Sequence, residues 1–197
     1  TLENSAKQAA LRIDLFFKNT LTKISSEAEF SVFADLLLSQ DIHKTKEILK
    51  ILHLLKTKDE LYILSYGILN AQGKNIIDTV KDNIGQLESD QWYFKTIQKN
   101  IYQSISQIVF EKDGSSFIAF VAPIIGPDSR LLGMLRVKYS SIILQVLLTS
   151  DYGLAGKGSF GILLNQYNLI LANSKNPNEI YKFYIKPQIL DTSLSLQ

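Results

Sequence analysis

The sequence predicts an α+β fold: a long N-terminal helix, a lobe built on an antiparallel sheet, and a second, incomplete lobe. Three observations predict it. Residues 2–38 contain neither glycine nor proline. Several strand-like apolar runs then follow one another with short turns between them, which favours an antiparallel sheet over β-α-β crossovers. After a glycine-rich stretch at residues 153–161, a new pair of strand-like runs begins.

The first segment carries apolar residues at a spacing of three and four, which is the period of a helix with one buried face. These residues are Leu2, Ala6, Ala9, Ile13, Phe17, Leu21, Ile24 and Ala28. We expect one helix to about Leu38, and two shorter helices broken near Ser25 and Ser26 are the alternative. A second helix should begin with Asp41 as its N-cap.

The next region reads as strands. Residues 61–69 are apolar on both faces of a strand, so we expect this strand to lie inside the sheet. Ser89 and Asp90 resemble the cap of a short helix. Three strands in meander order are expected at about 102–110, 117–125 and 131–139, with turns at 112–114 and 126–128.

The last region should contain a helix at 141–148, the glycine-rich stretch, and a hairpin formed by 160–164 and 169–173. We therefore expect three parts: the long helix at 1–40, a lobe at 41–152 and the start of a second lobe at 153–197. The sequence contains no exact internal repeat, but the strand pair from Phe160 resembles in kind a restart of the first sheet, which places the boundary near residue 153.

Composition excludes several classes of protein. The chain has 197 residues and a net charge of +2, with basic and acidic residues interspersed, so we expect no nucleic-acid partner. It has no cysteine, which removes disulfides, thiolate metal sites and cysteine nucleophiles. The longest apolar runs are far shorter than the ~20 residues that span a bilayer. No N-terminal signal pattern is visible, and we expect a soluble domain.

Two motifs do not support an enzyme. Residues 156–161 spell G-x-G-x-x-G, but a helix precedes them and a strand follows, opposite to the order that a dinucleotide site needs. We interpret these glycines as a turn between lobes. His43 and His53 lie ten residues apart on one expected helix and point about 80° away from each other. We interpret them as surface residues, and we expect no catalytic residue, metal or cofactor.

Four segments resemble a known family. They are LYILSYGILNAQGK, SDQWYFKTI, FIAFVAPIIGPDSRLLGMLRVKYSSIILQVL and GKGSFGILLNQYNLILANS. With the long helix before them, they resemble the double Cache sensor module of bacterial transmembrane receptors. The resemblance extends to about Ser174. It implies two stacked PAS-like lobes packed on a long helix, and a small ligand in the lobe farther from the membrane.

The resemblance also implies where a ligand would bind. In family members that sense amino acids, a Tyr, an Arg, a Trp-Tyr pair and a downstream Asp hold the ligand. The aromatic pair is present here as Trp92 and Tyr93, whereas the early Tyr position holds Gly85. The Arg position holds Asp90 and the Asp position holds Lys138, so both charges have the opposite sign. We therefore expect no standard grip on an α-amino acid.

The role of these residues stays open at this stage. Asp90 and Lys138 either face each other in a pocket, or hold a zwitterion in reversed orientation, or are a helix-terminal carboxylate and a solvated strand residue. An aromatic pair on a short helix is as readily core as ligand site. Tyr66 and Phe120 are further candidates for ligand contact. Alternation along the strand directs Phe120 and Val121 to opposite faces of the sheet, but the sequence does not tell which face a ligand would contact.

We expect the extracytoplasmic, periplasmic sensing portion of a membrane-bound receptor of the histidine kinase, chemoreceptor or cyclase type, without catalysis of its own. The resemblance implies a small-molecule ligand, membrane attachment through flanking transmembrane helices outside this chain, and a homodimer through the long N-terminal helix. A ligand-free Cache-like spacer for dimerisation and signal transmission is the first alternative. An unrelated α+β enzyme or adaptor is the second.

Overall fold

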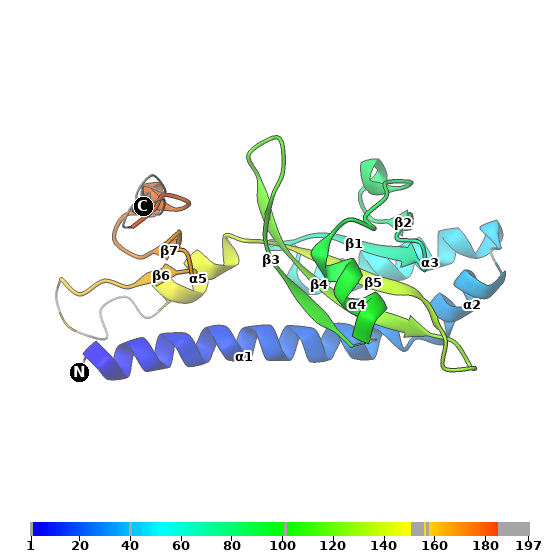
Figure 1. Cartoon of the computed structure of the whole chain (residues 1–197), viewed down its shortest axis with the longest axis horizontal. Coiled ribbons are helices and arrows are strands. Elements are labelled where there is room, and N and C mark those ends of the chain that lie inside the picture. The colour runs from blue at the N-terminus through cyan, green and yellow to red at the C-terminus, as the bar shows by residue number, and fades with distance from the viewer. Residues whose placement is uncertain (1, 40, 101, 151–155, 157, 185–197) are drawn as a thin grey trace, which may run out of the picture. The chain divides into compact units, whose positions relative to one another are not determined.

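A computed structural model describes residues 2–39, 41–100, 102–150, 156 and 158–184 (Figure 1). The helices are α1 (Leu2–Ala28), α2 (Ser31–Ser39), α3 (Ile42–Lys56), α4 (Trp92–Asn100) and α5 (Ile143–Thr149). The strands are β1 (Ile63–Asn70), β2 (Asn75–Asp78), β3 (Ser104–Phe110), β4 (Ser116–Ile125), β5 (Leu131–Ser140), β6 (Ile162–Leu164) and β7 (Ile170–Asn173). Short 3₁₀ turns lie at Thr57–Asp59 (η1), Lys81–Asn83 (η2) and Pro177–Glu179 (η3).

The chain forms two compact units. The larger comprises residues 15–141, and the smaller combines residues 1–14 with 142–197, so that α1 contributes to both. The lobe boundary predicted near residue 153 stays a prediction, because residues 151–155 lie outside the described part of the chain. In the described residues, no helix combines the length and the apolar character that crossing a membrane requires.

The expected single helix to about Leu38 is wrong. Helix α1 ends at Ala28, and α2 begins at Ser31. The break lies at Glu29 and Phe30, four residues after the expected alternative, because the helix absorbs Ser25 and Ser26: their hydroxyls donate to carbonyls one turn earlier. The turn lets α2 bury Phe33 and Leu36 in the larger unit. At α3 the predicted cap is confirmed, since the Asp41 carboxylate accepts the His43 N–H at 2.8 Å.

The larger unit is built on a five-stranded antiparallel sheet with the order β2-β1-β5-β4-β3. Strand β1 lies between β2 and β5, which confirms its predicted interior position. The β3-β4-β5 meander is also confirmed. Strand β2 was not predicted, because its four residues are too few to show a period. A tight turn joins it to β1, in which Gly73 has a φ of +81° and the Asn70 side chain accepts two backbone N–H groups.

The two faces of this sheet have different covers. Phe120 points to the helix face, where its ring contacts Phe16 and Phe17 of α1 at centroid distances of 6.2 and 5.8 Å. Val121 points to the opposite face, where it packs with Tyr93 and Phe94 of α4. We call this second side the α4 face. The question that the sequence left open is thereby answered: the side that carries Phe120 packs on the long helix.

The smaller unit contains α5, β6 and β7, which confirm the predicted helix and hairpin. The Gln145 side chain of α5 holds β7 through both its amide groups, which bond the carbonyl and the N–H of Asn173 at 2.9 and 2.8 Å. In the G-x-G-x-x-G stretch, Gly156 and Gly158 have φ values of +105° and +82°, and Lys157 lies outside the described residues. The chain then enters β6 without a helix, so a phosphate site of the dinucleotide type has no helix N-terminus here.

The aromatic cluster on the helix face should dominate the stability of the larger unit. Replacing the fully buried Phe120 with alanine removes its ring contacts and leaves a cavity, and should lower the free energy of unfolding by about 3–5 kcal/mol. Urea denaturation followed by circular dichroism measures this loss. Phe110→Ala is the matched control, because Phe110 is half exposed on β3. An equal loss in both variants would contradict the assignment of the core.

Candidate functional site

A fully buried arginine lies at the centre of the α4 face. Arg136 is on β5, and its side chain has no exposure to solvent. Alternation along β5 directs Met134, Arg136 and Lys138 to the same face. Gly67 of β1 pairs with Arg136 in the sheet and makes room for it. A Cβ atom at Gly67 would lie 2.5 Å from an Asp78 oxygen and 3.0 Å from the Arg136 guanidinium.

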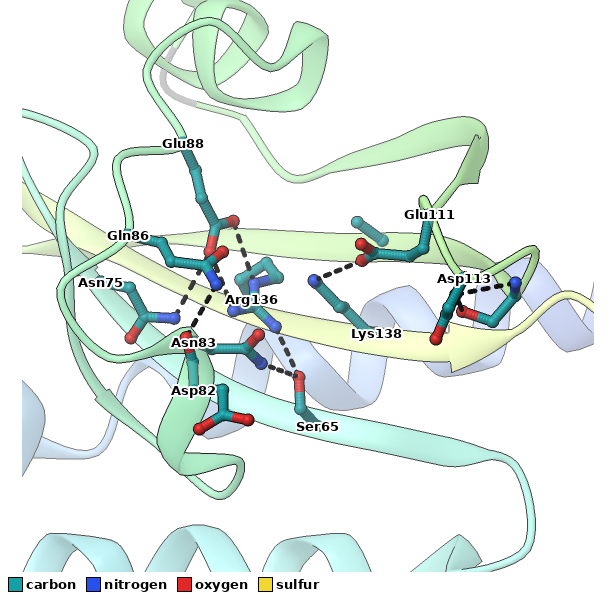
Figure 2. A network of polar contacts seen from close by, with 12 residues as sticks. Ser65, Asn75, Asp82, Asn83, Gln86, Glu88, Glu111, Asp113, Arg136 and Lys138 are labelled. Atoms are coloured by element: carbon teal, nitrogen blue, oxygen red, sulfur yellow. Dashed lines mark hydrogen bonds and ion pairs between the residues drawn. The ribbon is translucent and has the colours of Figure 1, made fainter.

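Three side chains accept hydrogen bonds from the Arg136 guanidinium. Nη2 donates to Asp78 Oδ2 at 2.7 Å, and Nη1 donates to Ser65 Oγ at 2.6 Å. Glu88 is bound by two parallel bonds, from Nη2 to Oε1 at 3.0 Å and from Nε to Oε2 at 3.2 Å. Figure 2 shows Glu88 reaching down from the segment that precedes α4 to meet Arg136 on the sheet. Such a bidentate pair is the strong form of an arginine–carboxylate interaction.

Two uncharged side chains complete the cluster. The Tyr93 hydroxyl of α4 donates to Glu88 Oε2 at 2.5 Å. The Asn75 amide of β2 donates to Asp78 at 2.9 Å and lies 3.4 Å from Glu88 Oε1. Asn75 Oδ1 is buried without a hydrogen-bond partner among the described residues. We call these six residues the Arg136 cluster: Ser65, Asn75, Asp78, Glu88, Tyr93 and Arg136.

Charge fixes the protonation states in the cluster. Burial alone would raise the pKa of Glu88, but Arg136 and the Tyr93 hydroxyl outweigh burial and lower that pKa below its usual value. Burial, followed by the charge of Glu88, raises the pKa of Tyr93. Burial would lower the pKa of Arg136, and the two carboxylates reverse this and raise it. At neutral pH Glu88 is therefore a carboxylate, Arg136 a guanidinium cation and Tyr93 a protonated phenol.

The structure brings two predicted site residues to this face. Tyr93 is in the cluster, and Lys138 lies beside it on β5. The Lys138 ammonium pairs with Glu111 at 3.1 Å and lies 4.3 Å from the centre of the Phe117 ring. Lys138 is thus neither solvated nor paired with Asp90: no ion pair joins Lys138 to Asp90 in the described structure, and Asp90 is exposed. Trp92 starts α4 with 60% of its surface exposed.

The structure does not bring the other two candidates to this face. Phe120 packs on α1, as described above. Tyr66 also points to the helix face, where its hydroxyl donates to Glu27 of α1 at 2.9 Å. Burial first, and the Glu27 charge second, raise the pKa of Tyr66. Both side chains are fully buried.

Sequence reasoning missed the centre of the cluster. Arg136, Asp78, Glu88 and Asn75 were not among the candidates. One signal was present: Arg136 stands within the apolar strand LLGMLRV, and an arginine is almost never buried without a partner. Nothing in the sequence identifies that partner, because Glu88 is 48 residues away and lies outside any regular element. Both histidines of α3 are exposed, as expected.

Removing the cation should destabilise the larger unit strongly. Arg136→Met leaves two buried carboxylates without a counter-charge and should lower the free energy of unfolding at pH 7 by about 3–5 kcal/mol. Arg130→Met is the matched control, because Arg130 forms an exposed ion pair with Asp128 and should matter by no more than about 0.5 kcal/mol. Urea denaturation of both variants measures the difference. A loss for Arg136→Met no larger than the control's would show that the cluster is not formed.

Acid should abolish the stabilisation that Glu88 provides. The folded-state pKa of Glu88 is lowered, so its contribution is present above the usual glutamate pKa of about 4.3 and is lost as pH falls through the folded value. Wild type should thus exceed Glu88→Gln in stability at pH 7 and lose this advantage progressively below about pH 4.3. Urea titrations of both chains between pH 7 and 3 measure the difference. An advantage that stays constant to pH 3 would contradict the bound, ionised state of Glu88.

Comparison of the chain with known proteins identifies structures that share its fold. No protein-family model matches the chain, and no curated protein matches it. Among solved structures, the ligand-binding domain of the Campylobacter jejuni chemoreceptor Tlp3 in complex with 4-methylisoleucine superimposes with a TM-score of 0.71 at 17% identity, over 94% of this chain and 72% of that one. The sensor domain of the Vibrio cholerae histidine kinase DctB gives a TM-score of 0.70 at 12% identity, over 90% and 67%.

A third structure is an extracellular ligand-binding receptor from Desulfohalobium retbaense, with a TM-score of 0.67 at 16% identity. It is matched over 91% of this chain, which spans only 32% of that receptor. At these identities the likeness establishes the fold. The chain thus has the α+β fold of the extracytoplasmic sensor domains of bacterial histidine kinases and chemoreceptors, which confirms for the fold the resemblance seen in its sequence.

Proposed function

We propose that this chain is the extracytoplasmic small-molecule-sensing domain of a membrane-bound signal-transduction receptor of the histidine kinase, chemoreceptor or cyclase type. The observation that carries the proposal is the shared fold, which extends over 90–94% of the chain with the Tlp3 and DctB sensor domains. The buried, charged α4 face supports it, because convergent polar groups with perturbed pKa values are candidates for a ligand site. The proposal assigns ligand binding to this chain, and no catalysis.

The proposal includes membrane attachment and self-association. Transmembrane helices outside this chain would anchor the receptor, with the domain on the extracytoplasmic side. Helix α1 would supply a homodimer contact, since Leu11 and Leu15, one turn apart, are 58% and 47% exposed. A ligand then acts by its difference in affinity for two positions of that helix.

An ordinary α-amino acid is not the ligand that the site favours. The neighbours include chemoreceptor domains solved with 4-methylisoleucine and with GABA. In this chain, the positions that the amino-acid grip would use hold Asp90, which is exposed, and Lys138, which is paired with Glu111. The one buried guanidinium on the α4 face of the described structure belongs to Arg136, and it already binds two carboxylates of the protein.

That last observation favours a second candidate function, a ligand-free spacer. Arg136 is already paired with Asp78 and Glu88, so the α4 face needs no ligand to supply a counter-charge for it. A domain of this kind would transmit signals or dimerise without binding a metabolite. The two functions predict opposite results in one experiment.

A ligand screen distinguishes them. The isolated domain should gain thermal stability with at least one compound in a panel of amino acids, carboxylates, amines and nucleobases, because a ligand that binds only the native state raises the melting temperature. Trp92, the only tryptophan in the sequence, gives an independent fluorescence readout beside the cluster. Arg136→Met provides the control, since it should lose the response. No response to any compound in either readout would favour the spacer.

A further inference from the structure

The Glu88 carboxylate is held in the way that a binding protein holds the carboxylate of a small molecule. Arg136 presents Nε and Nη2 to its two oxygens at 3.2 and 3.0 Å. Tyr93 adds a hydroxyl at 2.5 Å on one oxygen, and the Asn75 amide lies 3.4 Å from the other. An arginine fork with neutral donors on both oxygens gives orientation as well as charge complementarity.

The two carboxylates of the cluster are not equivalent. Asp78 is part of β2, its side chain has no solvent exposure, and its second oxygen accepts the Val80 N–H at 2.8 Å. It therefore fixes the guanidinium from within the sheet. Glu88 comes from the irregular segment between η2 and α4, and its side chain keeps 8% exposure. Of the two, Glu88 is the carboxylate on the solvent side.

The segment that carries Glu88 is held to β2 and its turn by backbone hydrogen bonds. The Asn75 N–H donates to the Gln86 carbonyl at 2.9 Å, the Gly85 N–H donates to the Asn75 carbonyl at 2.7 Å, and the Glu88 N–H donates to the Gly73 carbonyl at 2.8 Å. Leu87 and Ile84 direct 67% and 45% of their surface to solvent. Segments with few buried apolar contacts open at lower free energy than the strands beneath them. Release of Glu88 from Arg136 needs rotation of the Glu88 side chain, and the backbone bonds of the segment to Asn75 and Gly73 can stay in place.

We propose that Arg136, Tyr93 and Asn75 form a receptor for a carboxylate, that Glu88 is its built-in occupant, and that a small-molecule carboxylate binds by displacing Glu88. This inference rests on the proposed sensing function and names the ligand class of that site. Asp78 stays in place and keeps the guanidinium oriented. Displacement of Glu88 removes the ion pair that ties the segment from residue 79 to 91 to β5, and the loosening of this segment is the response to ligand.

Hydrogen-bond and charge requirements select the ligand class. One carboxylate replaces another, so Arg136 keeps two negative partners and the Tyr93 hydroxyl keeps an acceptor. A ligand without an acceptor would leave Arg136 Nε and the Tyr93 hydroxyl without the partner that Glu88 provides, and unpaired buried donors are unfavourable. An amine would place a second positive charge beside Arg136 with Asp78 as their shared carboxylate, which buries an unbalanced charge.

The test is to empty the receptor and fill it again. Glu88→Ala deletes a CH₂–COO⁻ group, which corresponds to acetate. Acetate at ~100 times its Kd should raise the melting temperature of this variant by about 5–10 °C relative to chloride at equal ionic strength. Wild type should not respond to acetate at this concentration, because the covalently attached Glu88 carboxylate outcompetes it. Glu88→Gln should not respond, because its amide fills the same space.

Two controls separate the receptor from general anion effects. Glu111→Ala removes the carboxylate paired with Lys138 on the same face, outside the Arg136 fork, and should show no acetate response. Adding Arg136→Met to Glu88→Ala should abolish the response. A Glu88→Ala chain that is folded, yet responds to acetate no more than Glu111→Ala, overturns the proposal. If Glu88→Ala is unfolded in chloride, acetate should restore its circular dichroism signal, and no recovery at 1 M acetate overturns the proposal equally.

Failure of the receptor and failure of the sensing function are distinguishable. Wild type could bind a compound that has no carboxylate, with no change in the hydrogen exchange of residues 79–91. That result would support the sensing function and contradict the carboxylate receptor. If Glu88→Ala responds to acetate while wild type binds no malonate, succinate, citrate or other compound of the panel, Arg136 binds carboxylates, but displacement of Glu88 and the sensing function are both contradicted. Binding of one of these carboxylates to wild type, with faster exchange in residues 79–91 alone, supports both.

Discussion

A buried guanidinium is the constraint on which the larger unit depends. Arg136 cannot lose its charge, so the fold has to bring carboxylates to it. Strand β2, with only four residues, supplies Asp78 from the edge of the sheet, and the segment before α4 supplies Glu88 from above. Gly67 leaves room between the strands for these side chains to meet. The short strand, the irregular segment and the glycine thus serve one electrostatic requirement.

The same strand that borders the cluster also reaches the long helix. Ser65, Tyr66 and Gly67 are consecutive in β1 and alternate between the two faces of the sheet. Ser65 bonds Arg136 on one face, and Tyr66 bonds Glu27 of α1 on the other. Tyr66 also exchanges two hydrogen bonds with Thr79, the residue after Asp78. A movement of Asp78 or Arg136 therefore acts on a strand residue that is itself attached to α1.

The sequence predicted the regular elements better than the site. Period and turn chemistry located the strands of the meander, the interior strand and the cap of α3, because these signals are local. They failed at the break between α1 and α2, where burial of Phe33 decides the geometry, and at β2, which is too short to show a period. The Arg136 cluster could not be predicted, because its ion pairs join residues that are distant in the sequence. Arg136 and Glu88 are separated by 48 residues, and only the fold brings them together.

The reversed charges at Asp90 and Lys138 also have an explanation in this structure. A pocket that grips an amino acid needs an arginine and an aspartate that are both unpaired until the ligand arrives. Here the arginine comes from β5, and the protein supplies its carboxylates. Stability alone does not explain such an arrangement, since well-packed apolar residues often stabilise a core as well as a buried ion pair does. In some proteins a buried ion pair serves specificity, because any replacement must restore both charge and geometry. The proposed carboxylate receptor assigns this role to the Arg136 cluster, which would select for the charge that Glu88 already provides.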